Sequence, residues 1–231
     1  MMVLQFDIKL SRKDKIKGLK LPNKLSKELA YLTGVLAGDG NIFIRKQKND
    51  YRIKCVGDPV TEIEFYDHVL KPLFKQVFNI EVDVKKQDSR KTYGFYIYSK
   101  ALVEYFTTLF ELPIGRKQDK LKIPQIIKQK NLIPDFIKGL ADADFGITYN
   151  KNSPRIIGSS SSKEFMKDVA KELKKIGFKF YEVYDYKRID SRFKKGYSLI
   201  NRIEITGKSK LALWMDKIGF LSPKHLKKIK I

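Results

Sequence analysis

Hydrophobic and polar positions alternate along the first half of the chain with two periods, one typical of helices and one typical of strands. Residues 27–38 form a short, mostly apolar segment behind Ser26, a residue suited to cap a helix, so a helix is expected there. Residues 41–47 alternate and predict a strand with Ile42 and Ile44 facing inward. The other elements expected in this half are strands at 51–56, 82–86 and 93–98 and a helix at about 60–77.

The second half shows the same order of elements. Pro134 is suited to the first position of a helix expected over 135–144. The strands expected in this half lie near 147–151, 155–158, 179–187 and 197–206. Each half therefore has the predicted order α-β-β-α-β-β-α. Strands in this order predict an α+β fold with one antiparallel sheet per half, helices on one face and the other face free.

Three sequence matches, in the same order, relate the two halves. Glu64–Leu73 matches Glu164–Leu173, Gly34–Asp39 matches Gly139–Asp144, and Ser99–Leu102 resembles Ser209–Ala212. Chance can supply one such match but hardly three in order, so we interpret the chain as a tandem duplication with a pseudo-twofold axis. The predicted units are a basic N-terminal segment over 1–22, a first repeat over 23–125 and a second repeat over 126–231.

The charge balance indicates the class of partner. The chain has 48 Lys and Arg against 26 Asp and Glu residues, a formal net charge of +22, which favours nucleic acid over an anionic membrane. One cysteine excludes internal disulfides and cysteine-ligated metal sites, and two histidines leave little room for histidine-based ones. Neither a signal peptide nor a membrane span is indicated, so we expect a cytoplasmic, nucleoid-associated protein.

The free faces of the two sheets gather side chains suited to DNA. Arg and Lys neutralise phosphates, whereas Asn, Gln and Arg match base edges in the major groove. A solvated sheet face explains any single one of them, but it explains the whole set less well in so basic a chain. The candidate DNA-binding residues are Asn41, Arg45, Gln47, Arg52, Lys54, Lys85, Gln87, Arg90 and Tyr96 in the first half, and Asn150, Arg155, Ser159, Tyr186, Arg188, Arg192, Lys194 and Arg202 in the second.

The two short helices share a stripe of small residues and a terminal acid. Small residues at this spacing predict that the helices cross closely at the pseudo-twofold axis. Asp39 and Asp144 place a carboxylate at the negative end of each helix, which costs on the order of 0.3–1 kcal/mol. Divalent cations between them would offset this cost and their mutual repulsion, and such a site suits phosphodiester hydrolysis. A chance aspartate before a capping glycine explains one helix, but not both. The stripe consists of Ala30, Gly34, Gly38, Gly139 and Ala143.

These residues resemble the signature of a known family. Leu32-Thr-Gly-Val-Leu-Ala-Gly-Asp-Gly40 and Ile137-Lys-Gly-Leu-Ala-Asp-Ala-Asp-Phe145 are similar to the two signature helices of the LAGLIDADG homing endonucleases, above all the monomeric, two-repeat archaeal type encoded in ribosomal-RNA introns. The resemblance covers about residues 26–231. It implies signature helices at the interface of the halves and a saddle of sheets on the major groove of a long asymmetric DNA site. Cleavage leaving 3′ overhangs is implied as well.

The resemblance also implies a site. Asp39 and Asp144 match the catalytic acids that bind Mg²⁺, with Mn²⁺ as a substitute, and the neighbouring Gly38 and Ala143 belong to the same metal-binding positions. The other motif acid, Asp142, stands where the family does not use it in catalysis.

The sequence departs from the family pattern at three points, one of which is the basic segment over 1–22 that precedes the first motif. Phe145 replaces the last glycine of the second motif. The Gln or Lys often found where each half's second strand ends is not evident, because Asp58 and Ser159 stand near these ends. Support for the active site is therefore expected from Asp58 or Ser159, or from Lys100 or Lys210, two lysines that follow a serine at a strand-to-helix junction.

Three functions compete for this sequence. The first is a DNA endonuclease that acts as a monomer on double-stranded DNA and has no membrane partner. The second is a non-cleaving maturase that binds intron RNA and assists splicing. The third is a regulator that binds double-stranded DNA. Because the loss of either acid would favour the other two functions and both acids are present, we favour the endonuclease, with intron RNA left open as a second partner.

Overall fold

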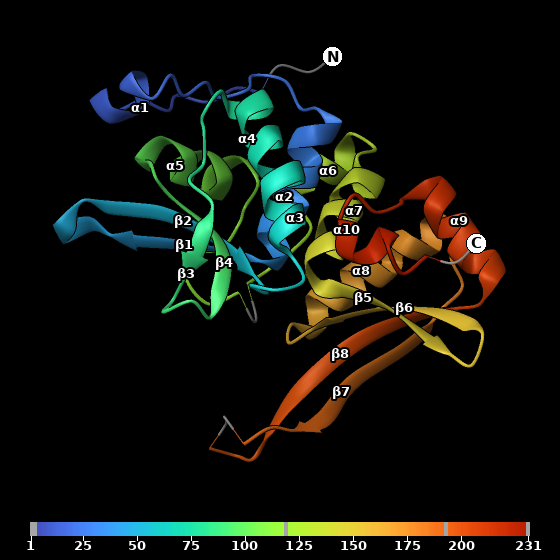
Figure 1. Cartoon of the computed structure of the whole chain (residues 1–231). Helices are drawn as coiled ribbons and strands as arrows, with labels where there is room; N and C mark the ends of the chain where they lie inside the picture. Colours follow the sequence, from blue (N-terminus) through green and yellow to red (C-terminus); the bar gives the residue numbers. More distant parts are fainter. Residues whose placement is uncertain (1–3, 118–119, 192–193, 230–231) are drawn as a thin grey trace.

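The computed structural model describes residues 4–117, 120–191 and 194–229. Its first half begins with a short N-terminal helix (Figure 1). Further helices and a sheet of four strands follow, with a π-helical turn, η2, inside the helix that joins the two hairpins. The elements are α1 (Arg12–Ile16), α2 (Lys27–Gly38), β1 (Gly40–Arg45), η1 (Lys46–Lys48), β2 (Asp50–Gly57), α3 (Ile63–Phe65), η2 (Tyr66–Leu70), α4 (Lys71–Phe78), β3 (Lys85–Gln87), β4 (Thr92–Tyr98) and α5 (Lys100–Leu109).

The second half repeats this order. Like the first half, it has a short helix before its signature helix, and it adds another short helix after its last long helix. Its elements are α6 (Gln125–Gln129), α7 (Ile133–Asp144), β5 (Phe145–Asn150), β6 (Ser153–Ser160), α8 (Lys163–Lys175), β7 (Tyr181–Ile189), β8 (Tyr197–Thr206), α9 (Lys208–Lys217) and α10 (Pro223–Leu226).

Two antiparallel sheets of equivalent topology result. The strand orders are β1-β2-β4-β3 and β5-β6-β8-β7. In each half the second strand of the second hairpin, β4 or β8, therefore lies beside the second strand of the first, or inner, hairpin, β2 or β6. Ile42 pairs with Ile53 in the first sheet and Ile147 with Ile156 in the second, and all four side chains are buried under the helices. The predicted α+β fold with two repeats is confirmed.

Local signals fix several of these boundaries. Ser26 Oγ accepts a hydrogen bond from the Leu29 N–H at 3.2 Å, and α2 spans the predicted residues. The strand predicted over 41–47 ends at Arg45, which places Gln47 in the turn η1, because Asn49 reverses the chain with a φ of 47°. The strand predicted over 82–86 is shifted to Lys85–Gln87.

The two signature helices pack without intervening side chains. A Cβ atom added to Gly34 would lie 2.0 Å from the Phe136 carbonyl oxygen, and one added to Gly139 would lie 2.0 Å from the Tyr31 carbonyl oxygen. Each glycine therefore lets the opposite backbone approach to a distance that no side chain would allow. The predicted close crossing of α2 and α7 is confirmed.

The described part of the N-terminal segment, residues 4–22, packs on the first half. Leu4 and Leu19 are buried, and the Phe6 and Tyr105 rings meet edge to face at 5.4 Å. The Lys20 N–H donates to the Phe78 carbonyl at 2.9 Å. The segment thus packs against α4 and α5. Among the described residues, no helix has both the length and the apolar character needed to cross a membrane.

Candidate active site and DNA interface

The two acids lie where the signature helices end together. Asp39 is the C-cap of α2 and Asp144 is the last residue of α7. A Cβ added to Gly38 would lie 2.5 Å from Ala143 Cβ and 3.2 Å from Asp144 Oδ2, so the end of α2 touches the end of α7. The structure therefore brings together Gly38, Asp39, Ala143 and Asp144, the four residues predicted to hold a metal.

Desolvation and nearby carboxylates disfavour the charged forms of both acids. Desolvation raises the pKa of Asp39 well above its usual value, and the charges of Asp144 and Glu62 raise it further. Asp144 is accessible to water, but the surrounding protein raises its pKa to about 6, mainly through desolvation. Lys117 and Lys224 oppose the shift at both acids.

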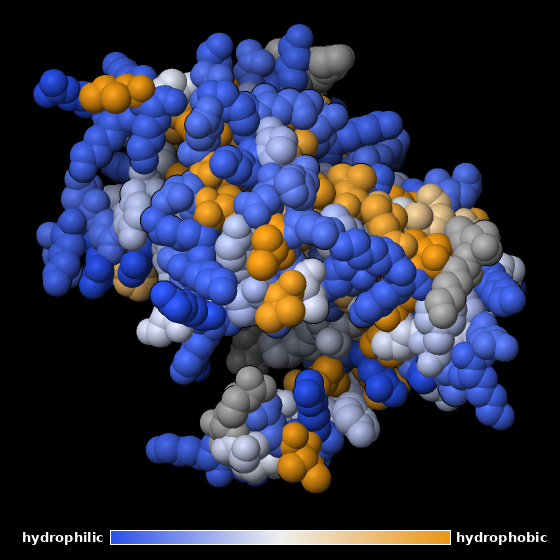
Figure 2. Space-filling view, viewed as in Figure 1, coloured by the Kyte–Doolittle hydropathy of each residue, from blue (hydrophilic) through white to orange (hydrophobic). Residues whose placement is uncertain are grey.

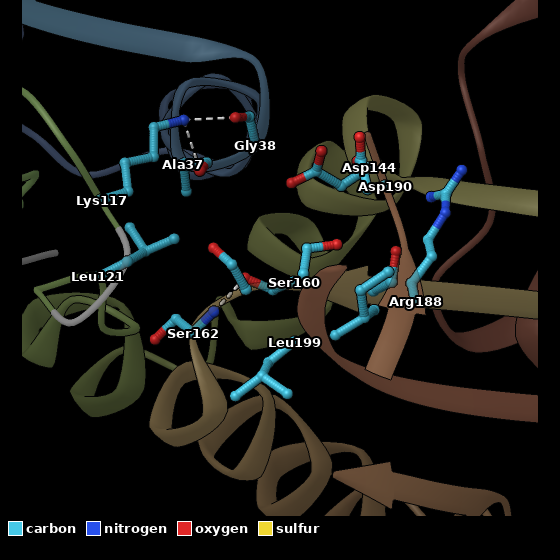
Figure 3. Close-up of a pocket in the computed structure, with 14 residues that line it drawn as sticks. Ala37, Gly38, Lys117, Leu121, Asp144, Ser160, Ser162, Arg188, Asp190 and Leu199 are labelled. Carbon is cyan, nitrogen blue, oxygen red and sulfur yellow. Dashed lines mark hydrogen bonds between the residues drawn. The ribbon is translucent and has the colours of Figure 1, made fainter. Parts of the chain in front are cut away.

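Lys117 lies against the end of α2. Its ammonium group donates to the Ala37 carbonyl at 2.9 Å and to the Gly38 carbonyl, two acceptors at the negative end of the helix (Figure 3). The Asp144 carboxylate points into the same pocket, which Ser159–Ser162 and Arg188 also line (Figure 3). Burial lowers the pKa of Lys117 and the charge of Asp144 raises it.

Lys224 reaches the site from α10. Its ammonium group forms an ion pair with Glu62, whose side chain is only 6% exposed. Lys117 and Lys224 stand 78 and 80 residues after the acid of their own repeat, so the two lysines are equivalent in the duplication. Sequence reasoning missed both, although extending the repeat comparison past the last helix of each half would have found them.

The remaining motif acid, Asp142, holds α10 in place. Asp142 is fully buried and its Oδ2 accepts hydrogen bonds from the Tyr31 hydroxyl at 2.6 Å and from the Leu221 N–H at 2.9 Å. Desolvation raises the pKa of Asp142 to about 6. Because Tyr31 belongs to the first half and Leu221 precedes α10, Asp142 ties the C-terminal segment to the helix interface and so positions Lys224.

Tyr66 and Cys55 form the buried wall beside Asp39. The Tyr66 hydroxyl lies 3.4 Å from Asp39 Oδ2 and 3.8 Å from Cys55 Sγ. Burial raises the pKa of both the Tyr66 hydroxyl and the Cys55 thiol, so both stay protonated at neutral pH. The sequence did not indicate a role for either residue, since both lie at positions whose pattern is that of ordinary core residues.

The donor set fits a hard divalent cation. Among the described residues there is no cluster of three or more His, Cys, Asp or Glu side chains able to hold a metal. Asp39 and Asp144 offer two carboxylates, and the Gly38 carbonyl faces a cation already, namely the Lys117 ammonium. Mg²⁺ is typically held by one or two carboxylates and completes its shell with water or phosphate oxygens, and this set supplies the protein part of that shell.

The free face of the first sheet carries its predicted basic residues in contact with aromatic rings or acids. The Arg52 guanidinium lies 4.4 Å from the centre of the Phe43 ring, and Arg45 pairs with Asp50 at 2.7 Å. The Lys54 ammonium pairs with Asp88 at 2.5 Å. These contacts hold the basic groups on one face and fix their orientation. The other candidates of this half are Asn41 on β1, Lys85 and Gln87 on β3, Tyr96 on β4, Gln47 in η1 and Arg90 in the β3–β4 turn.

The second sheet is arranged in the same way. Arg155 pairs with Glu204 across β6 and β8, and the Arg202 guanidinium lies 5.5 Å from the centre of the Tyr186 ring. Arg188 and Ser159 line the pocket beside Asp144. Asn150 and Lys194 are exposed at the ends of hairpins. Arg192 lies outside the described residues.

The residues predicted to support the active site lie in three places. Asp58 turns its carboxylate onto its own loop, where it accepts from the Val60 and Thr61 N–H groups at 3.0 and 2.8 Å. Lys100 pairs with Glu104 at 3.5 Å on the side of the N-terminal segment, and Lys210 lies on α9. Their roles remain predictions, whereas Lys117 and Lys224 act electrostatically on the acids.

Hydrophilic side chains cover much of the visible surface. Figure 2 shows mainly hydrophilic side chains over the first half, hydrophilic and hydrophobic ones together over the second, and a hollow between the body of the molecule and the protruding β7–β8 hairpin. The hairpin lies below the first sheet in the same view (Figure 1).

Sequence comparison finds similar segments inside longer proteins, although no protein-family model matches the chain. Three proteins of Methanocaldococcus jannaschii are a probable translation initiation factor IF-2 (32% identical over 206 residues), a replication factor C small subunit (29% over 206) and a glutamine–fructose-6-phosphate aminotransferase (25% over 215). The matches cover 87%, 88% and 91% of this chain but only 16%, 10% and 18% of the relatives. The chain therefore spans less than a fifth of each relative.

Comparison with solved structures identifies the fold. I-DmoI in complex with DNA and Ca is 18% identical, with a TM-score of 0.58 and coverage of 85% of this chain and 93% of that one. The homing endonuclease I-WcaI bound to its DNA recognition sequence is 15% identical, with a TM-score of 0.59 and coverage of 96% and 93%. The chain has the fold of a homing endonuclease. In this homing-endonuclease fold, the paired acids of the present chain lie at the junction of its two repeats.

Proposed function

We propose that this chain is a site-specific endonuclease that hydrolyses phosphodiester bonds in both strands of a long, asymmetric double-stranded DNA site. Asp39 and Asp144 bind a divalent cation, Mg²⁺ or Mn²⁺, and the products carry 3′ overhangs. The observation that carries the proposal is the pair of acids at the touching ends of α2 and α7, with one lysine from each repeat beside them. I-DmoI, a homing endonuclease of the same fold, has been solved with DNA and Mn.

The residues of this chain divide the work between binding and chemistry. The basic faces of the two sheets neutralise backbone phosphates and present Asn, Gln and Arg to base edges. Lys117 and Lys224 lie where they can stabilise negative charge that develops on the scissile phosphates. A divalent cation in such a site supplies charge neutralisation at the phosphate and activation of water. Since each repeat provides one acid and one lysine, each centre serves one strand.

One chain contains both halves of this site, which supports activity as a monomer. The three relatives come from one archaeon and differ in their stated activities, yet they share the same segment with this chain. The shared segment is therefore independent of initiation, replication or transferase chemistry. This distribution favours a module carried within protein genes over the ribosomal-RNA intron origin that the sequence resemblance implied.

The direct test is selection of a target from a randomised plasmid library in the presence of Mg²⁺. We expect one long, asymmetric site to be cut by the wild type, with 3′ overhangs at the ends. The control is the Asp39→Asn/Asp144→Asn double variant, which we expect to bind the selected site without cutting it. A folded wild type that binds nucleic acid but cuts no library member would contradict the proposal, and intron RNA and uncut DNA would be the next ligands to test.

A further inference from the structure

The two repeats differ at the buried position that caps the helix after the inner hairpin. The residue after each acid pairs with the second strand of its half, Gly40 with Cys55 and Phe145 with Gly158. Cys55 and Gly158 are therefore equivalent, and so are the strand ends two residues later, Gly57 and Ser160. The next helix of each half begins behind a cap residue, which is Glu62 before α3 and Ser162 before α8. The first repeat therefore has a carboxylate where the second repeat has a hydroxyl.

The first repeat is built around this carboxylate. Glu62 Oε2 accepts a hydrogen bond from the Asp58 N–H at 2.5 Å, and a Cβ added to Gly57 would lie 1.8 Å from the same oxygen. The other oxygen, Oε1, holds the Lys224 ammonium. The two side chains of this pair are only 6% and 17% exposed. Glu62 thus compensates the charge of Lys224 at short range in a place that water screens weakly.

Lys117, the equivalent lysine, has a different partner. It contacts the Ala37 and Gly38 carbonyls, and within the described parts of the chain no ion pair includes it. Carbonyl dipoles orient the ammonium group without cancelling its charge. The net positive charge available to a phosphate is therefore larger at Lys117 than at Lys224.

We propose, on the basis of the proposed endonuclease function, that Glu62 makes the two strand-cleaving centres unequal. Glu62 is a positioning residue that holds Lys224 and reduces the charge it offers to the scissile phosphate. The strand served by Lys224 is consequently cut more slowly than the strand served by Lys117, and a nicked intermediate accumulates.

The test is strand-resolved cleavage of the selected site, with each strand labelled separately, under single-turnover conditions. Glu62→Gln keeps the shape and the acceptor for the Asp58 N–H but removes the charge, so we expect the slow strand to be cut faster by about tenfold and the fast strand to be unchanged. Glu64→Gln is the matched control, because Glu64 forms an exposed pair with Lys227 on the same two elements. We expect Glu64→Gln to leave the strand ratio unchanged.

A strand ratio that Glu62→Gln leaves unchanged, or a slow strand that becomes slower, would overturn the inference. If Glu62→Gln fails to fold, as judged by its unfolding temperature and DNA binding, Lys117→Met and Lys224→Met replace it. These two variants should slow opposite strands, with the larger loss for Lys117→Met, whereas equal losses on both strands would overturn the inference. A wild type that cuts neither strand would instead refute the proposed function itself, so the two failures are distinguishable.

Discussion

At the scale of single residues, the site stores unfavourable electrostatics that a cation would relieve. Asp39 and Asp144 lie at the negative ends of two helices that touch, and desolvation and nearby negative charge raise the pKa of both. The lysines offset only part of this penalty. A site that is unfavourable in its free form and complementary to cations and phosphates is what metal-assisted hydrolysis requires.

Asp144→Asn should therefore stabilise the protein at neutral pH in the absence of divalent cations. The raised pKa makes the folded state bind a proton more tightly, so the stability that Asp144 contributes is fully present below about pH 4 and is lost as the pH rises through about 6. We expect Asp144→Asn to raise the free energy of unfolding by about 1 kcal/mol at pH 7. This is less than the full pKa shift of Asp144 implies, because water reaches the carboxylate. Urea unfolding of both proteins at pH 4 and 7 measures it. An equal difference at both pH values would contradict this assignment.

Lys117→Met should slow cleavage at unchanged DNA affinity. The ammonium group is the cation nearest to the last carbonyls of α2, and its loss removes a donor that we assign to the developing charge on the phosphate. We expect about a hundredfold loss of single-turnover rate. Lys100→Met and Lys210→Met test the sequence-based alternative in the same assay. If either variant loses more of its single-turnover cleavage rate than Lys117→Met does, the lysine replaced in that variant supports the active site instead of Lys117.

The position of a residue in the fold determines whether its role could be predicted from the sequence. Asp39 and Asp144 end regular helices in a repeated motif, so their positions follow from the pattern. Lys117, Glu62 and Lys224 lie in or beside irregular segments, where no period indicates the direction of a side chain. Long-range contacts alone bring these three residues to the acids.

At the scale of elements, the crossing of α2 and α7 determines the geometry of the site. The helices contact through glycines, so the acids at their ends have little freedom to separate. Asp142 adds a second connection, because it binds Tyr31 of α2 and the segment before α10. Small changes at this interface should therefore affect stability and cleavage together.

Gly34→Ala should destabilise the protein strongly. The added methyl group would lie 2.0 Å from the Phe136 carbonyl oxygen, and backbone cannot move aside as a side chain can. We expect a loss of about 3 kcal/mol or more in the free energy of unfolding. Gly146→Ala is the matched control, since no atom lies within 4 Å of its added Cβ. Similar losses in both variants would show that the close helix contact is not the cause.

The elements differ in how well the sequence predicted them. The bounds of α2 and β8 match the predicted residues, because a capping serine fixes the first and a long alternation the second. β1 is shorter and β3 is shifted, since the turns beside them use left-handed residues at Asn49 and Asp88 that alternation does not reveal. Short helices such as α1 and α10 have no periodic signal of their own.

At the scale of the whole molecule, the duplication produces two basic sheets beside one site. The net charge of +22 was the first indication of a nucleic-acid partner, and the sheets display part of it on their free faces. Several of these basic groups pair with acids in the free protein, so DNA must compete for them. The unpaired basic groups are expected to neutralise phosphates and release counterions, so binding should still depend steeply on salt.

The slope of log K against log salt measures this dependence. We expect about −0.9 for each phosphate neutralised, and a slope less steep by about 1 for Arg52→Gln if Arg52 contacts a phosphate. Lys217→Gln is the control, because Lys217 pairs with Asp216 at the end of α9. A flat salt response of the wild type would contradict binding through the sheet faces.

The central claim is that the paired acids cleave DNA. The most direct measurement is single-turnover cleavage of the selected site with Mg²⁺, at equal occupancy, by the wild type and the Asp39→Asn and Asp144→Asn variants. We expect the wild type to cut both strands, whereas each variant should bind with similar affinity and make no double-strand break. A variant that still breaks both strands at the wild-type rate would show that the chemistry lies elsewhere.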